Sequence, residues 1–271
     1  MPYEPNNLPY EIDKPKVMKV LEIKNVHKIY NSSEVKVHAV NGITLDFEKG
    51  EFAAIVGPSG SGKTTLLNMI GGLDTPTEGE IMVDSTNLAG LKSTALIDFR
   101  MRNIGFVFQS YNLIPVLTAK ENVEFIMSLQ KWNKKERDDR TFELLKAVGL
   151  EERVNSRPSK LSGGQQQRVA VARALASKPK FVLADEPTAN LDSKSTETLL
   201  DIMEELNKEE GITFIFSTHD ARVVKKARRV ITVEDGKVIS DERKKYSSDD
   251  PPALLFVTST GAHCPKGLWA G

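Results

Sequence analysis

The chain has 271 residues and is electrically balanced, with 37 Lys and Arg residues against 37 Asp and Glu residues. This balance argues against a protein whose whole surface binds nucleic acid, although it leaves room for a local basic patch. Apolar residues make up 39% and the only cysteine is Cys264, which indicates a globular chain without an internal disulfide or a multi-cysteine zinc site.

The first segment, residues 1–18, is a leader that we expect to be extended. Prolines interrupt it, acidic residues recur in it, and no basic start is followed by an apolar run, so we do not expect a secretory signal. No stretch of the sequence approaches the roughly 18 apolar residues of a membrane-spanning helix. If the chain works at a membrane, we therefore expect separate subunits to cross it.

Strand patterns follow the leader. Residues 20–23 and 43–47 alternate between apolar and polar side chains. Residues 52–56 are continuously apolar, which is typical of a strand buried on both faces. A glycine-rich turn then leads into a helix predicted over residues 63–70.

The middle of the chain, about residues 112–177, contains no buried-strand pattern and is predicted to be helical throughout. Within it, residues 131–140 are nearly all charged, which is typical of a solvated helix face or loop. We interpret this region as a helical insertion in the fold.

Two more buried strands are predicted, over residues 181–184 and 212–216. Between them an amphipathic helix is predicted over residues 193–210, and Gly211 ends it. The basic segment 221–230 is predicted to be a solvated helix face. Strands that alternate with helices in this way predict an α/β fold with a parallel central sheet.

A glycine-rich motif follows the strand of residues 52–56. It fits the pattern G-x-x-x-x-G-K-[ST], in which backbone N–H groups and a helix start surround a polyphosphate. We expect Lys63 to reach the β- and γ-phosphates and Thr64 to take a Mg²⁺ position. The predicted nucleotide-binding residues here are Gly57, Ser59, Gly60, Ser61, Gly62, Lys63, Thr64 and Thr65.

Two acidic residues, Asp185 and Glu186, end the strand of residues 181–184. A carboxylate at the C-terminal end of a parallel strand faces the crevice where α/β folds bind ligands. Asp185 is therefore predicted to hold Mg²⁺, and Glu186 to polarise the attacking water.

A second phosphate-binding helix start is predicted just before the helix of residues 166–176. It consists of Ser162, Gly163, Gly164 and Gln165. A simple P-loop enzyme does not need a second phosphate-binding helix start. Such a helix start is explained if these residues meet the γ-phosphate of an ATP held by another copy of the chain.

Together these motifs resemble the ATP-binding subunits of ABC transporters, whose signature matches residues 161–165, Leu-Ser-Gly-Gly-Gln. The resemblance covers about residues 18–242. It implies an ATP-binding domain over residues 19–242, with a P-loop ATPase core, an N-terminal antiparallel β subdomain and the helical subdomain at about 112–177. Residues 243–271 are left as a tail that we expect to be disordered or non-native.

The resemblance implies further site residues in the family's order. Tyr30 would stack on adenine, Gln109 would link Mg²⁺ to the helical subdomain, and His219 would contact the γ-phosphate. Residues 189–192 match the family's D-loop, and the resemblance implies that Asp192, the last of them, lies at the nucleotide. The implied catalytic residues are Glu186, His219, Gln109 and Lys63, and the implied metal ligands are Thr64, Gln109 and Asp185.

As in that family, two copies would close head to tail around two ATP molecules, and hydrolysis would loosen the closure. The resemblance thus implies a homodimer that hydrolyses ATP with Mg²⁺ at the cytoplasmic face of the membrane, bound to separate integral membrane permease subunits. No nucleic-acid partner is expected. A groove beside Gln109, lined by Tyr111, Asn112, Leu113 and Pro115, would receive a coupling helix of the permease.

Within the family, residues 102–115 and 185–192 are similar to the lipoprotein-releasing and macrolide-export group. An importer ATPase subunit and a cell-division ATPase are alternatives. A soluble ABC ATPase that acts on DNA or ribosomes is disfavoured, because Lys63 and Ser162 are close in sequence and the chain has one cassette and one cysteine. The transported substrate is not identified.

Overall fold

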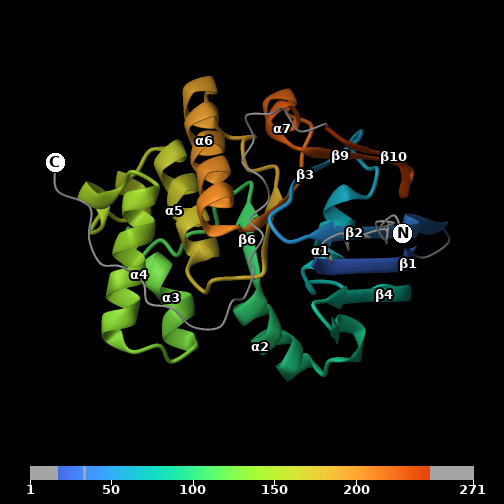
Figure 1. The fold of residues 1–271 in the computed structure, drawn as a ribbon, viewed down its shortest axis with the longest axis horizontal. Coiled ribbons are helices and arrows are strands. Elements are labelled where there is room, and N and C mark those ends of the chain that lie inside the picture. Colours follow the sequence, from blue (N-terminus) through green and yellow to red (C-terminus); the bar gives the residue numbers. More distant parts are fainter. Residues whose placement is uncertain (1–17, 33–34, 245–271) are drawn as a thin grey trace, which may run out of the picture.

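A six-stranded sheet forms the centre of the computed structural model, which describes residues 18–32 and 35–244 (Figure 1). The strand order is β10-β9-β3-β8-β7-β6, and all neighbours are parallel except β10 and β9. The strands are β3 (Phe52–Val56), β6 (Ile104–Phe108), β7 (Phe181–Asp185), β8 (Thr213–Ser217), β9 (Arg229–Glu234) and β10 (Lys237–Arg243). The predicted α/β fold with a parallel central sheet is confirmed.

The expected leader and tail lie almost wholly outside the described residues. Met18 is described from the leader, and Arg243 and Lys244 are described from the tail. Their expected extended and disordered states therefore stay predictions.

A second, antiparallel sheet lies on one side of the central sheet, at the right of Figure 1. Its order is β2-β1-β4-β5, with β1 (Lys19–Ser32), β2 (Val35–Glu48), β4 (Glu78–Val83) and β5 (Thr86–Asn87). Alternate residues of β1, such as Leu21 and Ile23, are buried in one core with α1 (Lys63–Ile70). The antiparallel subdomain that the family resemblance implies is thus present.

Helices occupy the interval between β6 and β7, on the side of the molecule opposite the antiparallel sheet (Figure 1). Thr118 and Glu121 form a reciprocal cap at the start of α3, which fixes where this group of helices begins. The helices here are α3 (Ala119–Leu129), α4 (Lys134–Ala147) and α5 (Gly163–Leu175), with short 3₁₀ turns η2 (Glu151–Arg153) and η3 (Pro158–Lys160). The remaining helices are η1 (Leu88–Gly90), α2 (Ser93–Asn103), α6 (Ser193–Glu210) and α7 (Ala221–Lys226).

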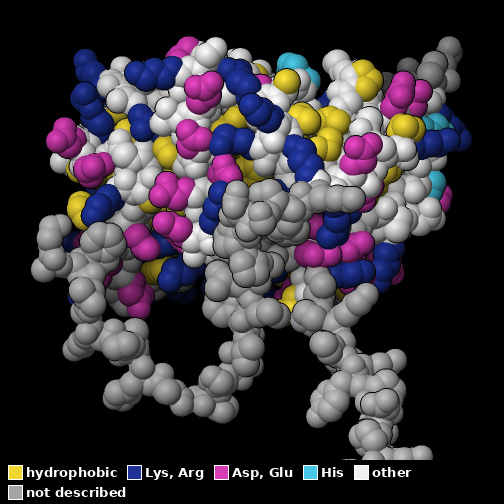
Figure 2. All heavy atoms as spheres, turned by 45° about the horizontal axis from the view of Figure 1, so that its top comes forward, with side chains coloured by type: hydrophobic (Ala, Val, Ile, Leu, Met, Phe, Trp, Pro, Cys, Tyr) yellow, Lys and Arg dark blue, Asp and Glu magenta, His cyan; other side chains and the backbone are white. Residues whose placement is uncertain are grey.

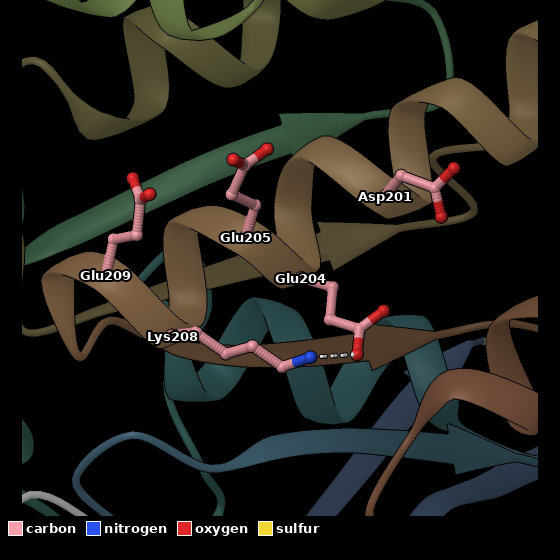
Figure 3. A pocket seen from close by; sticks show the side chains of 5 residues that line it. All are labelled: Asp201, Glu204, Glu205, Lys208 and Glu209. Carbon is pink, nitrogen blue, oxygen red and sulfur yellow. Dashed lines mark hydrogen bonds and ion pairs between the residues drawn. The ribbon is translucent and has the colours of Figure 1, made fainter. Parts of the chain in front are cut away.

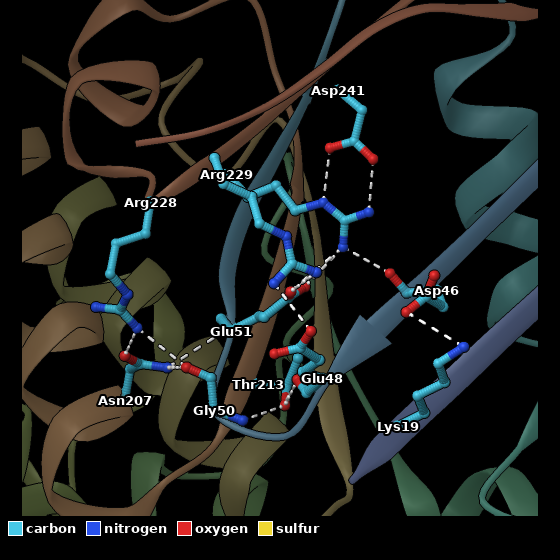
Figure 4. Close-up of polar contacts among 11 residues, drawn as sticks. Lys19, Asp46, Glu48, Gly50, Glu51, Asn207, Thr213, Arg228, Arg229 and Asp241 are labelled. Carbon is cyan, nitrogen blue, oxygen red and sulfur yellow. Dashed lines mark hydrogen bonds and ion pairs between the residues drawn. The ribbon is translucent and has the colours of Figure 1, made fainter. Parts of the chain in front are cut away.

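The prediction of one solvated helix over residues 221–230 is wrong. The helix α7 ends at Lys226, and Arg229 begins β9 with only 4% of its surface exposed. Its guanidinium donates to Asp241 at 2.7 Å and to Glu51 at 3.0 Å (Figure 4). Glu51 is 178 positions away in the sequence and Asp241 belongs to the neighbouring strand β10, so this buried cation has partners that the charge pattern of residues 221–230 does not reveal.

The surface carries charges of both signs. Figure 2 shows basic and acidic side chains mixed over the face that it draws, in agreement with their equal numbers in the sequence. Among the helices formed by residues 18–32 and 35–244, none has the length and apolar character needed to cross a membrane.

Candidate nucleotide site

Strand register brings the predicted site residues to one edge of the central sheet. Phe108 of β6, Asp185 of β7 and Ser217 of β8 are partners across the ladder, and Ile55 of β3 pairs with Ser217. The residues that directly follow these paired strand ends therefore lie along the same edge of the sheet. They are Gln109, Glu186, Thr218 with His219, and the P-loop. This is the edge where parallel α/β sheets bind ligands.

The P-loop between β3 and α1 depends on glycine at its two ends. A Cβ atom on Gly62 would lie 2.1 Å from the carbonyl oxygen of Ala39, and one on Gly57 would lie 2.0 Å from that of Val233. Gly62 caps α1 with a left-handed φ of 99° and has no side chain to satisfy the first N–H groups of the helix. These N–H groups are left to bind an anion.

Two further groups in the loop fit a phosphate. The ammonium of Lys63 donates to the carbonyl oxygens of Gly57 at 2.9 Å and Pro58 at 2.8 Å, so it lies inside the loop. The hydroxyl of Ser61 is buried and has no hydrogen-bond partner among the described residues. A buried hydroxyl without a partner is costly unless a ligand completes it.

Thr64 and Asp185 lie together as predicted for metal ligands. The Thr64 hydroxyl at the start of α1 donates to Asp185 Oδ1 at 3.2 Å. Among the described residues, no three or more His, Cys, Asp and Glu side chains lie together in a way that could hold a metal. A hydroxyl and a single carboxylate fit Mg²⁺, which protein sites commonly bind through one or two carboxylates together with substrate phosphates.

Glu186 is held in a strained backbone conformation next to His219. Its φ is 45°, in the left-handed region that non-glycine residues seldom adopt and that functional sites often contain. His219 Nδ1 lies 2.7 Å from Glu186 Oε1, and the Thr218 hydroxyl donates to Glu186 Oε2 at 3.2 Å. The carboxylate of Glu186 is thereby fixed at both oxygens.

The signature residues form a separate group at the start of α5. The Ser162 hydroxyl accepts from the Gln165 N–H at 3.2 Å, and the Gln165 side chain accepts from the Ser162 N–H at 2.9 Å. Gly163 and Gly164 lie against Tyr111 and Ser195, which are close enough to meet an added Cβ at 2.8 Å. Within the described part of the chain, no hydrogen bond joins this turn to the P-loop.

Asp192 serves as the N-terminal cap of α6. Its carboxylate accepts from the Ser195 N–H at 2.9 Å and from the Ser195 hydroxyl at 2.7 Å, and these hydrogen bonds lower its pKa. Its predicted contact with a nucleotide stays a prediction.

Two residues of α5 that sequence reasoning missed connect the signature helix to the other segments. The Gln167 side chain is fully buried and donates to the carbonyl oxygen of Pro187 at 2.7 Å and to that of Phe108 at 3.3 Å. Arg173 donates to the carbonyl oxygen of Tyr111 at 2.8 Å. The helix α5 therefore holds the segments next to Gln109 and Glu186, although no sequence motif marks either residue.

Asp220 is expected to stabilise the fold in a pH-dependent way. The side-chain hydrogen bonds of Arg222 outweigh burial and, helped by Thr188, lower the pKa of Asp220 from 3.8 to about 2. Since the folded pKa is the lower one, this stabilisation is complete above the unfolded pKa and is lost as pH falls from about 4 towards 2.

We predict that Asp220→Asn lowers the free energy of unfolding by about 1–2 kcal/mol at pH 7, after allowance for solvent screening. The difference should shrink to roughly half at pH 3. Urea unfolding of both proteins at the two pH values measures it, and an equal difference at both would show that the charge of Asp220 is not the cause.

A surface hollow on α6 contains none of the predicted site residues. Figure 3 shows the side chains that line it, and Lys208 in it pairs with Glu204 at 2.7 Å. The lining residues are Asp201, Glu204, Glu205, Lys208 and Glu209. Four carboxylates beside one ammonium repel a triphosphate, so this hollow does not suit a nucleotide.

Comparison with known proteins points to one family. The family model described as ABC transporter matches residues 40–189. An uncharacterized ABC transporter ATP-binding protein, YvrO of Bacillus subtilis, is 49% identical over 84% of this chain and 99% of its own length. The macrolide export ATP-binding/permease protein MacB of Hyphomonas neptunium is 46% identical over 88% of this chain, which spans 37% of MacB.

The fold also has a close counterpart among solved structures. A dimeric, post-hydrolysis structure of the ATP-binding cassette MJ0796 bound to ADP and Pi aligns with a TM-score of 0.77 and 44% identity. The alignment covers 84% of this chain and all of the MJ0796 chain, a protein of Methanocaldococcus jannaschii. This agreement confirms the fold class that the sequence predicts.

Proposed function

Because the chain belongs to the ABC transporter family, as an ATP-binding subunit that hydrolyses ATP, we propose how its residues bind and cleave the nucleotide. The observation that carries the proposal is the juxtaposition of three elements at one sheet edge. The P-loop, the Thr64–Asp185 pair and the Glu186–His219 pair all lie where β3, β7 and β8 end.

The triphosphate is proposed to lie over the P-loop, with the free N–H groups of α1, the Lys63 ammonium and the Ser61 hydroxyl as donors. Tyr30 is proposed to stack on the adenine. Thr64, Asp185 and Gln109 would hold Mg²⁺, which when bound neutralises charge on the phosphate oxygens.

Glu186 is proposed to act as the general base. Its carboxylate is fixed by Thr218 and His219 and can take a proton from a water that attacks the γ-phosphate. His219 orients this carboxylate through its Nδ1 atom, and its other ring nitrogen, which has no hydrogen bond among the described residues, is proposed to meet the γ-phosphate. Positioning and charge stabilisation then supply the rate increase, as is usual for phosphoryl transfer.

We propose that the active form is a homodimer in which each signature turn completes the site of the other copy. The dimeric MJ0796 structure supports the assembly. The Ser162 turn has no hydrogen bond to the P-loop of its own chain among the described residues, so this helix start is proposed to meet a phosphate bound to the other copy. Asp192, at the start of α6, is proposed to approach the nucleotide from this interface.

Separate membrane-spanning permease subunits of the macrolide-export type are proposed as the partner, which would hold the chain at the cytoplasmic face of the membrane. YvrO, nearly all of which the chain matches, is named an ATP-binding protein, whereas MacB is named for both an ATP-binding and a permease part. Exposed apolar side chains in the segment that follows Gln109 are proposed to receive the permease together with the predicted groove of Tyr111, Asn112, Leu113 and Pro115. They are Val116, Phe125 and Leu129.

Co-expression with a membrane-spanning permease subunit of the macrolide-export type tests the proposal. The two proteins should copurify in detergent, and the complex should hydrolyse ATP in the presence of Mg²⁺ and stop when EDTA removes it. Phe125→Asp, on α3, should abolish copurification, and Phe142→Asp, on an exposed position of α4, should leave it intact. Equal copurification of both variants would contradict this docking surface.

A further inference from the structure

We propose that Asp74 is a positioning residue for the base of the nucleotide, because it fixes the ring of Tyr30. Asp74 lies four residues after the end of α1, the helix whose start carries the P-loop. The inference rests on the proposed function, in which Tyr30 stacks on adenine.

The contact between Asp74 and Tyr30 is direct. The Tyr30 hydroxyl donates to Asp74 Oδ2 at 2.7 Å, across 44 positions of sequence. Burial and the nearby carboxylate raise the pKa of Tyr30, so the phenol keeps the proton that it donates. Tyr30 is 41% exposed, so it is accessible to a ligand while its hydroxyl is held by Asp74.

Lys28 holds the Asp74 carboxylate in place. Its ammonium donates to Asp74 Oδ1 at 2.6 Å and to the carbonyl oxygen of Thr75 at 2.8 Å. The Thr75 N–H donates to the same Oδ1 at 2.7 Å. Burial opposes ionisation of Asp74, but the hydrogen bonds from Lys28, Tyr30 and Thr75 outweigh it and lower the Asp74 pKa, so the carboxylate stays charged.

Lys28 also contacts the aromatic ring. Its ammonium lies over the Tyr30 ring, 4.9 Å from the centroid, in the geometry of a cation–π contact. The Lys28 side chain is only 12% exposed, so it fills the space between the ring and the carboxylate. The edge and one face of the ring are thus held, and a base can stack on the other face.

The helix α1 links the proposed base site to the phosphate site and sets the distance between them. The start of α1 carries the phosphate-binding N–H groups, and the segment after its end carries Asp74, which fixes Tyr30. A side chain that is already ordered does not lose rotamer freedom when the ligand binds. Losing the Asp74 contact should therefore weaken nucleotide binding by roughly 2- to 10-fold without slowing the chemical step.

The test compares Tyr30→Phe, Asp74→Ala, the double variant Tyr30→Phe/Asp74→Ala, and Tyr30→Ala. Tyr30→Phe and Asp74→Ala should each raise KM for MgATP by roughly 2- to 10-fold with kcat within about 2-fold. The double variant should bind no worse than the weaker single one, because both changes remove the same hydrogen bond. Asp84→Ala is the matched control, since Asp84 follows β4, pairs with Lys180 at 2.7 Å and should leave KM unchanged when replaced.

Inorganic tripolyphosphate, used as a competitor without a base, separates positioning of Tyr30 from a general structural effect. Its inhibition constant should be the same for all variants, and a parallel loss of tripolyphosphate binding would overturn the proposal. If Tyr30→Ala raises KM while Tyr30→Phe and Asp74→Ala behave like the wild type, the positioning role is wrong and stacking by Tyr30 stands. If Tyr30→Ala leaves KM unchanged, the proposed stacking by Tyr30 is wrong, and the role of Asp74 falls with it.

Discussion

Replacing Glu186 by glutamine should lower the rate of ATP hydrolysis by roughly 100-fold or more while ATP still binds. The amide has the size of the carboxylate and can still accept from the Thr218 hydroxyl, which is 3.2 Å from Oε2 in the native site. It cannot take a proton from water. Because the γ-phosphate then stays in place, the variant should also accumulate as an ATP-bound dimer.

Steady-state hydrolysis, equilibrium ATP binding and gel filtration with ATP measure these three effects. Glu209→Gln is the matched control, because Glu209 is exposed on α6 and faces the acidic hollow of Figure 3. It should hydrolyse ATP at the native rate. Native turnover in Glu186→Gln would remove this residue from the reaction.

Replacing Ser162 by arginine should abolish hydrolysis and leave ATP binding to the P-loop nearly unchanged. A long cation at this helix start fills the place where the γ-phosphate of the other copy would meet the Ser162 turn, so only that one site is lost. The P-loop of the same chain has no hydrogen bond to this turn among the described residues. Loss of the cap should also cost about 1 kcal/mol of stability, too little to unfold the protein.

Hydrolysis rates and ATP affinity of Ser162→Arg are to be compared with those of Ser93→Arg. Ser93 is exposed at the start of α2, where the helix has no side-chain cap, so this control adds the same charge at another helix start. The control should keep its activity. A Ser162→Arg protein that still hydrolyses ATP would rule out the shared site.

Local sequence patterns were sufficient for the elements that carry the phosphate-binding motifs. The predicted helices over residues 63–70 and 193–210 have the bounds of α1 and α6, and Gly211 ends α6 with a left-handed φ of 63°. Continuous apolar runs likewise located β3, β7 and β8. These patterns work because each reflects burial or capping within a few neighbouring residues.

Contacts between distant segments could not be predicted in the same way. The strand β6 contains Gly105, which weakens a strand pattern, and glycine is needed there because a Cβ would lie 2.5 Å from the carbonyl oxygen of Ala174 in α5. Arg229 is buried with its charge paired by Glu51, just before β3, and by Asp241 of β10. The basic run around it is locally indistinguishable from a solvated helix.

The same limit applies to the site. The sequence motifs name Glu186 and His219, and the structure adds the 2.7 Å contact that pairs them. Motifs give no sign of Gln167, Arg173 or Asp74, because these residues act through carbonyl oxygens or through another side chain. Only the folded chain shows that one helix, α5, holds the segments beside both Gln109 and Glu186.

The shared site is tested most directly by mixing Glu186→Gln and Ser162→Arg chains before ATP is added, and then measuring hydrolysis. In a mixed dimer, one site has both changes and the other has neither. Equal mixing should restore about a quarter of the native rate, because about half of the dimers are mixed and each contains one intact site. A rate no higher than the two variants give separately would contradict a site built from two copies.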